Sequence, residues 1–155
     1  MRRSAVSSLL ARNVRKRLLL GLGTELLLKA AFLNAGYAIN LRAGKPPFPV
    51  KFGDIADAEL KPKTASLDDC IKNLAKVLPR QDLQEAKEGL MIARAFRNKE
   101  AHSVLAAHRF DPETYRIIEA ALKAVYRGAF GEALSVTIAM TKDDRAAWRI
   151  RSNAT

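Results

Sequence analysis

The hexapeptide Arg97-Asn98-Lys99-Glu100-Ala101-His102 carries side chains that could act together on a phosphodiester. Histidine titrates near neutral pH, so His102 could take or donate a proton. Arginine offers always-charged donors, which suit Arg97 to the negative oxygens of a phosphate. Asparagine can orient an imidazole or donate to the same phosphate, which is the role expected of Asn98. Without metal ligands, this set favours RNA cleavage by the neighbouring ribose 2′-hydroxyl.

The position of Arg97 strengthens this interpretation. Leu83, Leu90 and Arg97 are seven residues apart, so a helix places all three on one face. A guanidinium in line with leucines is costly unless an acidic or anionic group meets it. Such conflicts between pattern and polarity tend to mark functional sites. The alternative is a structural ion pair between Arg97 and an acid such as Glu25 or Glu100.

Helical geometry limits how the motif can work. In a continuous helix, positions 97 and 102 differ by about 140°, so their side chains would point apart. The helix must therefore break between Arg97 and His102, or a second chain must contribute, and a site across a two-fold axis is favoured. His102 could instead be a helix-surface or capping histidine.

The composition indicates one mostly helical domain over residues 1–155. Hydrophobic residues make up 48% and aromatic residues only 6%, which favours helices over sheets. The formal net charge of +11 predicts polyanionic partners, nucleic acid first and acidic membrane surfaces second. One cysteine, Cys70, and two histidines exclude a disulfide framework and a typical structural zinc site, so we expect no metal or cofactor. A reducing, cytoplasmic location is expected, with no transmembrane segment.

The first seventeen residues are basic and contain no acid. Residues 1–15 form an N-terminal extension that could touch RNA or a membrane surface, or could be solvated; the lack of acids is also typical of an organellar transit peptide. The cations are Arg2, Arg3, Arg12, Arg15, Lys16 and Arg17.

The stretch from Leu18 to Leu33 is apolar almost all round, which predicts a helix buried on several sides and ended by Gly36. Within it, Glu25 either pairs with Lys29 at i, i+4 or reaches a basic site.

Residues 40–63 contain four prolines, which predicts a loop rather than a long helix. The loop's cations either line an RNA path or are simply solvated; they are Arg42, Lys45, Lys51, Lys61 and Lys63.

The second half predicts further helices. Ser66 with Asp69 forms a capping pattern before a helix that Pro79 ends, and the next helix leads to Arg97. Another begins at Asp111-Pro112-Glu113 and ends near Gly128, and 132–141 is also assigned as helix, before a basic tail over 142–155. The expected fold is an all-α, up-and-down bundle of four to five helices with a Pro-rich loop after the first long helix.

The hexapeptide resembles the Arg-x4-6-His motif of HEPN domains (higher eukaryotes and prokaryotes nucleotide-binding), in the form where a polar residue follows the arginine. The order of elements is also similar: an apolar helix with Glu25-Leu-Leu-Leu-Lys29, then Gly36-Tyr37, a variable loop and a motif-bearing helix. The resemblance covers about residues 16 to 130.

The resemblance implies an all-α bundle, usually dimeric, and often a metal-independent endoribonuclease with toxin–antitoxin, abortive-infection or RNA-processing roles. It makes Arg97 and His102 catalytic, with Asn98 assisting. Family toxins controlled by adenylylation carry a tyrosine two residues after the histidine. Here Val104 occupies that position, so the resemblance does not extend to control by that route.

The partners expected are therefore RNA, a second copy that completes the active site, and an antitoxin protein. Further candidates for RNA contact are Lys99, Arg94, Lys45 and Lys51, and Glu25 is expected to support the site. The alternative function is a non-catalytic helical module that binds RNA, a nucleotide or a protein. A third is a membrane-surface or ribosome-associated protein that acts through residues 1–17.

Overall fold

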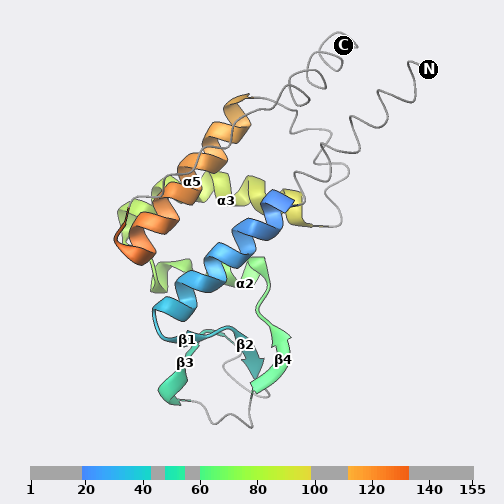
Figure 1. The fold of residues 1–155 in the computed structure, drawn as a ribbon, viewed down its shortest axis with the longest axis vertical. Helices are drawn as coiled ribbons and strands as arrows, with labels where there is room; N and C mark the ends of the chain where they lie inside the picture. Colours follow the sequence, from blue (N-terminus) through green and yellow to red (C-terminus); the bar gives the residue numbers. More distant parts are fainter. Residues whose placement is uncertain (1–18, 43–47, 55–59, 99–111, 133–155) are drawn as a thin grey trace, which may run out of the picture.

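The computed structural model describes residues 19–42, 48–54, 60–98 and 112–132, which are mostly helical (Figure 1). The first described helix, residues 19–34, is called helix 19–34 below. The later helices are α2 (Leu67–Lys72), α3 (Arg80–Arg97) and α5 (Pro112–Phe130), with short 3-10 turns η1 (Phe52–Asp54) and η3 (Leu74–Lys76). The predicted mostly helical fold is confirmed. The predicted helix over 132–141 lies outside the described residues except for residue 132, and both basic termini lie outside them.

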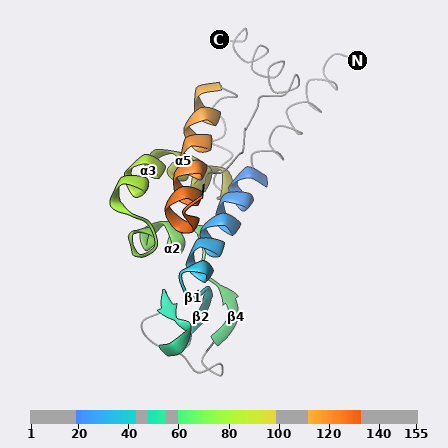
Figure 2. The same ribbon diagram turned by 60° about the vertical axis from the view of Figure 1, so that its left-hand side comes forward.

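Two small antiparallel strand pairs lie at the C-terminal end of helix 19–34 (Figures 1 and 2). β1 (Tyr37–Ala38) pairs with β3 (Val50–Lys51), and β2 (Asn40–Arg42) pairs with β4 (Leu60–Thr64) through an irregular register. The described part of 40–63 contains no long helix, as predicted, but the prediction of a loop without regular structure was wrong because these strands form there. Prolines forbid a helix there but permit two-stranded pairs, in which every strand is an edge strand, and Pro62 lies within β4.

Most helix termini lie where the sequence predicted them. Gly36 ends helix 19–34 with a positive φ of 85°, and Ser66 and Asp69 form the predicted capping box of α2. The end of α5 was predicted wrongly: the helix continues past Gly128 to Phe130, and Gly131 with φ 71° follows it. Leu78 and Asp82 lie against Gly128 and leave no room for a side chain, which explains why a glycine stands inside the helix at this position.

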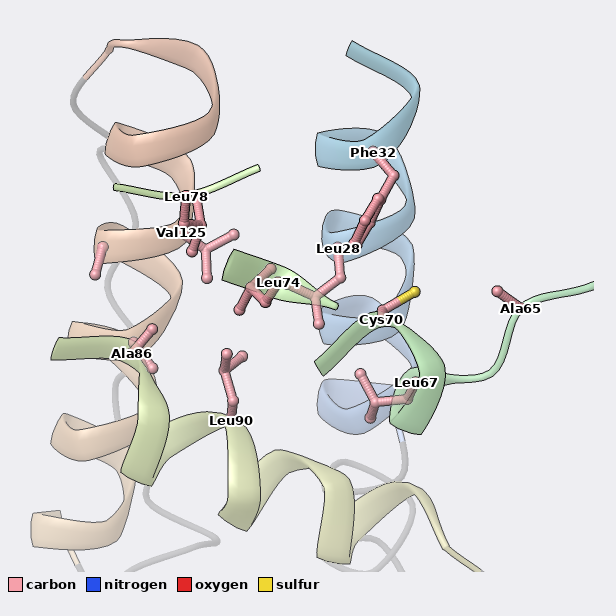
Figure 3. Packing of buried hydrophobic residues seen from close by; sticks show 12 residues of the cluster. Leu28, Phe32, Ala65, Leu67, Cys70, Leu74, Leu78, Ala86, Leu90 and Val125 are labelled. Carbon is pink, nitrogen blue, oxygen red and sulfur yellow. The ribbon is translucent and has the colours of Figure 1, made fainter. Parts of the chain in front are cut away.

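The core joins helix 19–34 to the other helices (Figure 3). Leu28 and Phe32 point into a cluster with Leu74, Leu90 and Val125, all fully or almost fully buried. Cys70 belongs to the same cluster, and burial raises the pKa of its thiol to about 12, so it is a protonated core residue.

Helix 19–34 is less buried than the sequence predicted, because one side of it is exposed to solvent. Its opposite face leaves four leucines exposed to solvent: Leu19, Leu22, Leu26 and Leu33. The helices α2, α3 and α5 contribute enough apolar surface to cover only one side of it. No described helix is long and apolar enough to cross a membrane.

The helices α3 and α5 cross closely where Gly89 faces α5. A Cβ atom at Gly89 would lie 2.4 Å from the Ala121 Cβ and 2.5 Å from the Ile117 carbonyl oxygen. Real Cβ atoms do not approach other heavy atoms so closely, and the Ile117 oxygen belongs to backbone that cannot turn aside. The absence of a side chain at residue 89 therefore sets the distance between the two helices.

We expect Gly89→Ala to lower the free energy of unfolding by roughly 1–3 kcal/mol, because overpacking outweighs the gain in helix propensity. Gly23→Ala is the matched control, because nothing lies within 4 Å of a Cβ at that helical position. The control should be neutral or stabilising by up to about 1 kcal/mol. Urea unfolding of both variants measures the difference, and equal effects would show that the crossing is not so tightly packed.

Candidate active site around Arg97

Arg97 is the last residue of α3, and the chain leaves the helix immediately after it. Asn98 has extended backbone angles (φ −73°, ψ 145°), while its amide still donates to the Arg94 carbonyl oxygen at 3.1 Å. The break that Arg97 and His102 would need is therefore present at Asn98. His102, Lys99 and Lys45 lie outside the described residues, so their positions relative to Arg97 stay predictions.

The Arg97 guanidinium is held by Glu25. Its Nε donates to the Glu25 Oε2 at 2.8 Å, from a helix 72 residues away in sequence. The Glu25 side chain is only 11% exposed, whereas that of Arg97 is 45% exposed. One edge of the guanidinium is thus fixed against the body of the protein, and nearly half of the side chain remains accessible to a ligand.

Glu25 also accepts a second cation. The Lys29 Nζ lies 2.9 Å from the Glu25 Oε1 and donates to the Thr64 hydroxyl at the same distance. The carboxylate therefore bridges Lys29 and Arg97, one on each oxygen. Thr64 is the last residue of β4, so this network links helix 19–34, α3 and the strand pair.

The pKa of Glu25 reflects two opposing effects. Burial by itself would raise the pKa of this carboxyl above its ordinary value of 4.5. The hydrogen bonds from Lys29 and Arg97, together with their positive charges, outweigh burial and lower the pKa below that value. Glu25 is consequently ionised at neutral pH, which is the state that anchors Arg97.

Gly21 allows helix 19–34 to approach the end of α3. A Cβ at this position would lie 2.9 Å from the Arg97 amide nitrogen and 3.1 Å from both the Arg97 Cα and the Ala93 carbonyl oxygen. All of these are backbone atoms, so they cannot yield to a side chain. The same contact places Glu25, one turn later in helix 19–34, within reach of Arg97.

Two other residues predicted to contact RNA, Arg94 and Lys51, have partners of their own. Arg94 forms an ion pair with Asp68 at the start of α2. Its Nε faces the Asp68 Oδ1, and its Nη2 donates to the Asp68 Oδ2 at 3.3 Å. Lys51 lies over the Tyr37 ring, 5.1 Å from its centroid, at the C-terminal end of helix 19–34. Arg97 packs at Gly21, whereas Lys51 pairs with Tyr37 beyond the end of the helix at residue 34, so roughly 20 Å of helix separates them at 1.5 Å per residue. The structure brings Glu25 to Arg97 but does not bring Lys51 there.

The predicted i, i+4 pair between Glu25 and Lys29 is confirmed. Sequence analysis missed two other features: the bond from Lys29 to Thr64 and the close contact at Gly21. A glycine inside an apolar helix often marks a close helix crossing, so Gly21 was the one that could have been found. Thr64 carries no such pattern, because its contact depends on where β4 packs. Within the described residues, no three His, Cys, Asp or Glu side chains gather in a way that could hold a metal ion.

Comparisons of the chain with family models, with curated proteins and with solved structures found no match.

We expect Glu25→Gln to lower the free energy of unfolding by about 1–3 kcal/mol at neutral pH, because Lys29 and Arg97 lose their common anion. The lower end applies if solvent screens the half-exposed Arg97. Since the folded-state pKa of Glu25 is lowered, its stabilisation exists above the unfolded-state pKa and is lost as the pH falls through the folded-state pKa. The gap between wild type and variant should therefore shrink below about pH 4.5.

Urea unfolding between neutral pH and strongly acidic pH measures this gap. Glu88→Gln is the matched control, since Glu88 is an exposed carboxylate on α3. A gap for Glu25→Gln that stays constant with pH would mean that the carboxylate charge does not act through this network.

Proposed function

We propose that the chain is a metal-independent endoribonuclease of the HEPN type that cleaves RNA by attack of the ribose 2′-hydroxyl. The observation that carries the proposal is the anchored arginine at the end of α3. Its guanidinium is fixed by a buried carboxylate at 2.8 Å, its side chain remains 45% exposed, and the next residue is an extended Asn98. A fixed cation that needs no rearrangement is what stabilises charge developing on a phosphorane.

His102 in this mechanism takes the proton of the 2′-hydroxyl or donates one to the leaving 5′-oxygen. Arg97 binds the non-bridging oxygens, and Asn98 orients the imidazole or donates to the phosphate. The products are a 2′,3′-cyclic phosphate and a 5′-hydroxyl. In a homodimer with a composite site, two copies of His102 would supply the base and the acid.

The wider proposal follows the resemblance. It comprises an up-and-down bundle of four to five helices, cytoplasmic location, and a role as a toxin or antiphage or stress-response effector with a possible antitoxin partner. The net charge of +11 supports RNA as the substrate class, and phosphate contacts would make binding strongly salt-dependent.

Cleavage of mixed RNA should persist in EDTA. His102→Ala should lower the rate by roughly 10²–10⁴-fold and Arg97→Ala by roughly 10²–10³-fold, because each removes one means of transition-state stabilisation. His108→Ala and Arg116→Ala serve as matched controls, and Arg116 is an exposed arginine whose ion pair lies within its own helix. Loss of cleavage with the chelator, or full activity of His102→Ala, would refute the proposal.

Glu25→Gln tests the anchor separately from the catalytic groups. Loss of one charged hydrogen bond of about 1.5 kcal/mol should lower kcat by roughly tenfold, with less change in KM. A change in KM alone would indicate that Glu25 affects only ground-state binding.

A non-catalytic binding module is the second candidate, and it is favoured by the same ion pair, since a purely structural Arg97 would also pair with Glu25. It predicts salt-sensitive RNA binding that survives His102→Ala, with no cleavage by the wild type. The EDTA assay and a binding assay on the same preparations distinguish the two.

A further inference from the structure

The exposed side of helix 19–34 forms a continuous apolar surface, called here the leucine face (Leu19, Leu22, Leu26 and Leu33). These side chains are 61%, 40%, 58% and 43% exposed. At 100° per residue they fall within an arc of about 60°. In Figure 2 the helix lies at the edge of the helical group, with α3 and α5 on one side of it.

No charged side chain of the helix interrupts this surface. Gly23 and Ala30 widen the apolar arc to about 100° at the same angular step. Lys29 borders the arc, but its ammonium turns away to Glu25 and Thr64. The two charged residues of the helix thus serve the network at Arg97 and leave the leucine face without charge. Clustered exposed leucines of this kind mark an interaction surface, unlike single exposed apolar residues.

The stretch of sequence before the leucine face is strongly basic. Six of the cations, and no acid, lie in residues 1–17, against a net charge of +11 for all 155 residues. A partner for this part of the chain must therefore be both apolar and anionic. RNA satisfies the charge but gains nothing from leucines, and a second copy covers leucines but supplies no anionic surface for the basic residues.

We propose that the leucine face binds an anionic lipid surface, which the net charge of +11 attracts. Leucines at this spacing can enter the boundary between headgroups and acyl chains, while arginine and lysine side chains reach the lipid phosphates. Basic segments beside an apolar face bind anionic leaflets in this way, and the interaction weakens with salt. The proposal does not depend on ribonuclease activity, because Arg97 and Glu25 are not part of the surface.

Vesicle flotation of the full-length, RNA-free protein tests the proposal. The protein should float with phosphatidylcholine vesicles that contain about 30% phosphatidylglycerol, and much less with phosphatidylcholine alone or at high salt. Leu22→Gln/Leu26→Gln should lower the partition coefficient by at least about tenfold, because two apolar side chains no longer enter the bilayer. Glutamine is as good a helix former as leucine, so the helix should remain folded, which circular dichroism checks.

Met91→Gln is the matched control, since Met91 is a 44% exposed apolar residue of α3 outside the leucine face. It should float like the wild type, and so should His102→Ala. Failure of the wild type to float, or unchanged flotation of the double leucine variant, would overturn the proposal. A wild-type dimer that Leu22→Gln/Leu26→Gln dissociates, with no flotation, would instead assign the leucine face to a second copy.

Discussion

The bridge that Glu25 makes between Lys29 and Arg97 holds the candidate site to the fold. A buried carboxylate with a cation on each oxygen satisfies its charge locally, which is the condition for placing ions inside a protein. The bridge also determines which way Arg97 faces, because one edge of the guanidinium is occupied. The accessible part of Arg97 is therefore set by Glu25 and not by Arg97 alone.

This arrangement depends on close packing as well as on charge. Gly21 lets helix 19–34 meet the last turn of α3, and Gly89 lets α3 meet α5. The first contact sets the distance that the Glu25–Arg97 hydrogen bond requires. The second aligns α3 against α5, where Ile92, Phe96, Ile118 and Leu122 form a second apolar cluster. Geometry at Arg97 is thus a consequence of backbone approach at two glycines.

The two sides of helix 19–34 have different roles. Its inner side contributes Leu28 and Phe32 to the core and Glu25 to the candidate site, while its outer side presents leucines to solvent. Phe32 also contacts the rings of Tyr37 and Phe48, so the strand pairs are attached to the same helix. One helix consequently connects the core, the site, the strand segment and the proposed lipid-binding surface.

The sequence by itself determined the mostly helical fold, the cap at Ser66 and the end of helix 19–34 at Gly36, because these depend on neighbouring residues and on local backbone preferences. It also identified Arg97 as misplaced on an apolar stripe and named Glu25 as a possible partner. Only the tertiary structure decided that the two meet, since 72 residues separate them and the contact depends on how helix 19–34 crosses α3. The tertiary structure also decided the strands over 37–64, because strand pairing is non-local. It likewise decided the exposure of the leucines, because an apolar helix is buried only where other elements supply a surface to cover it.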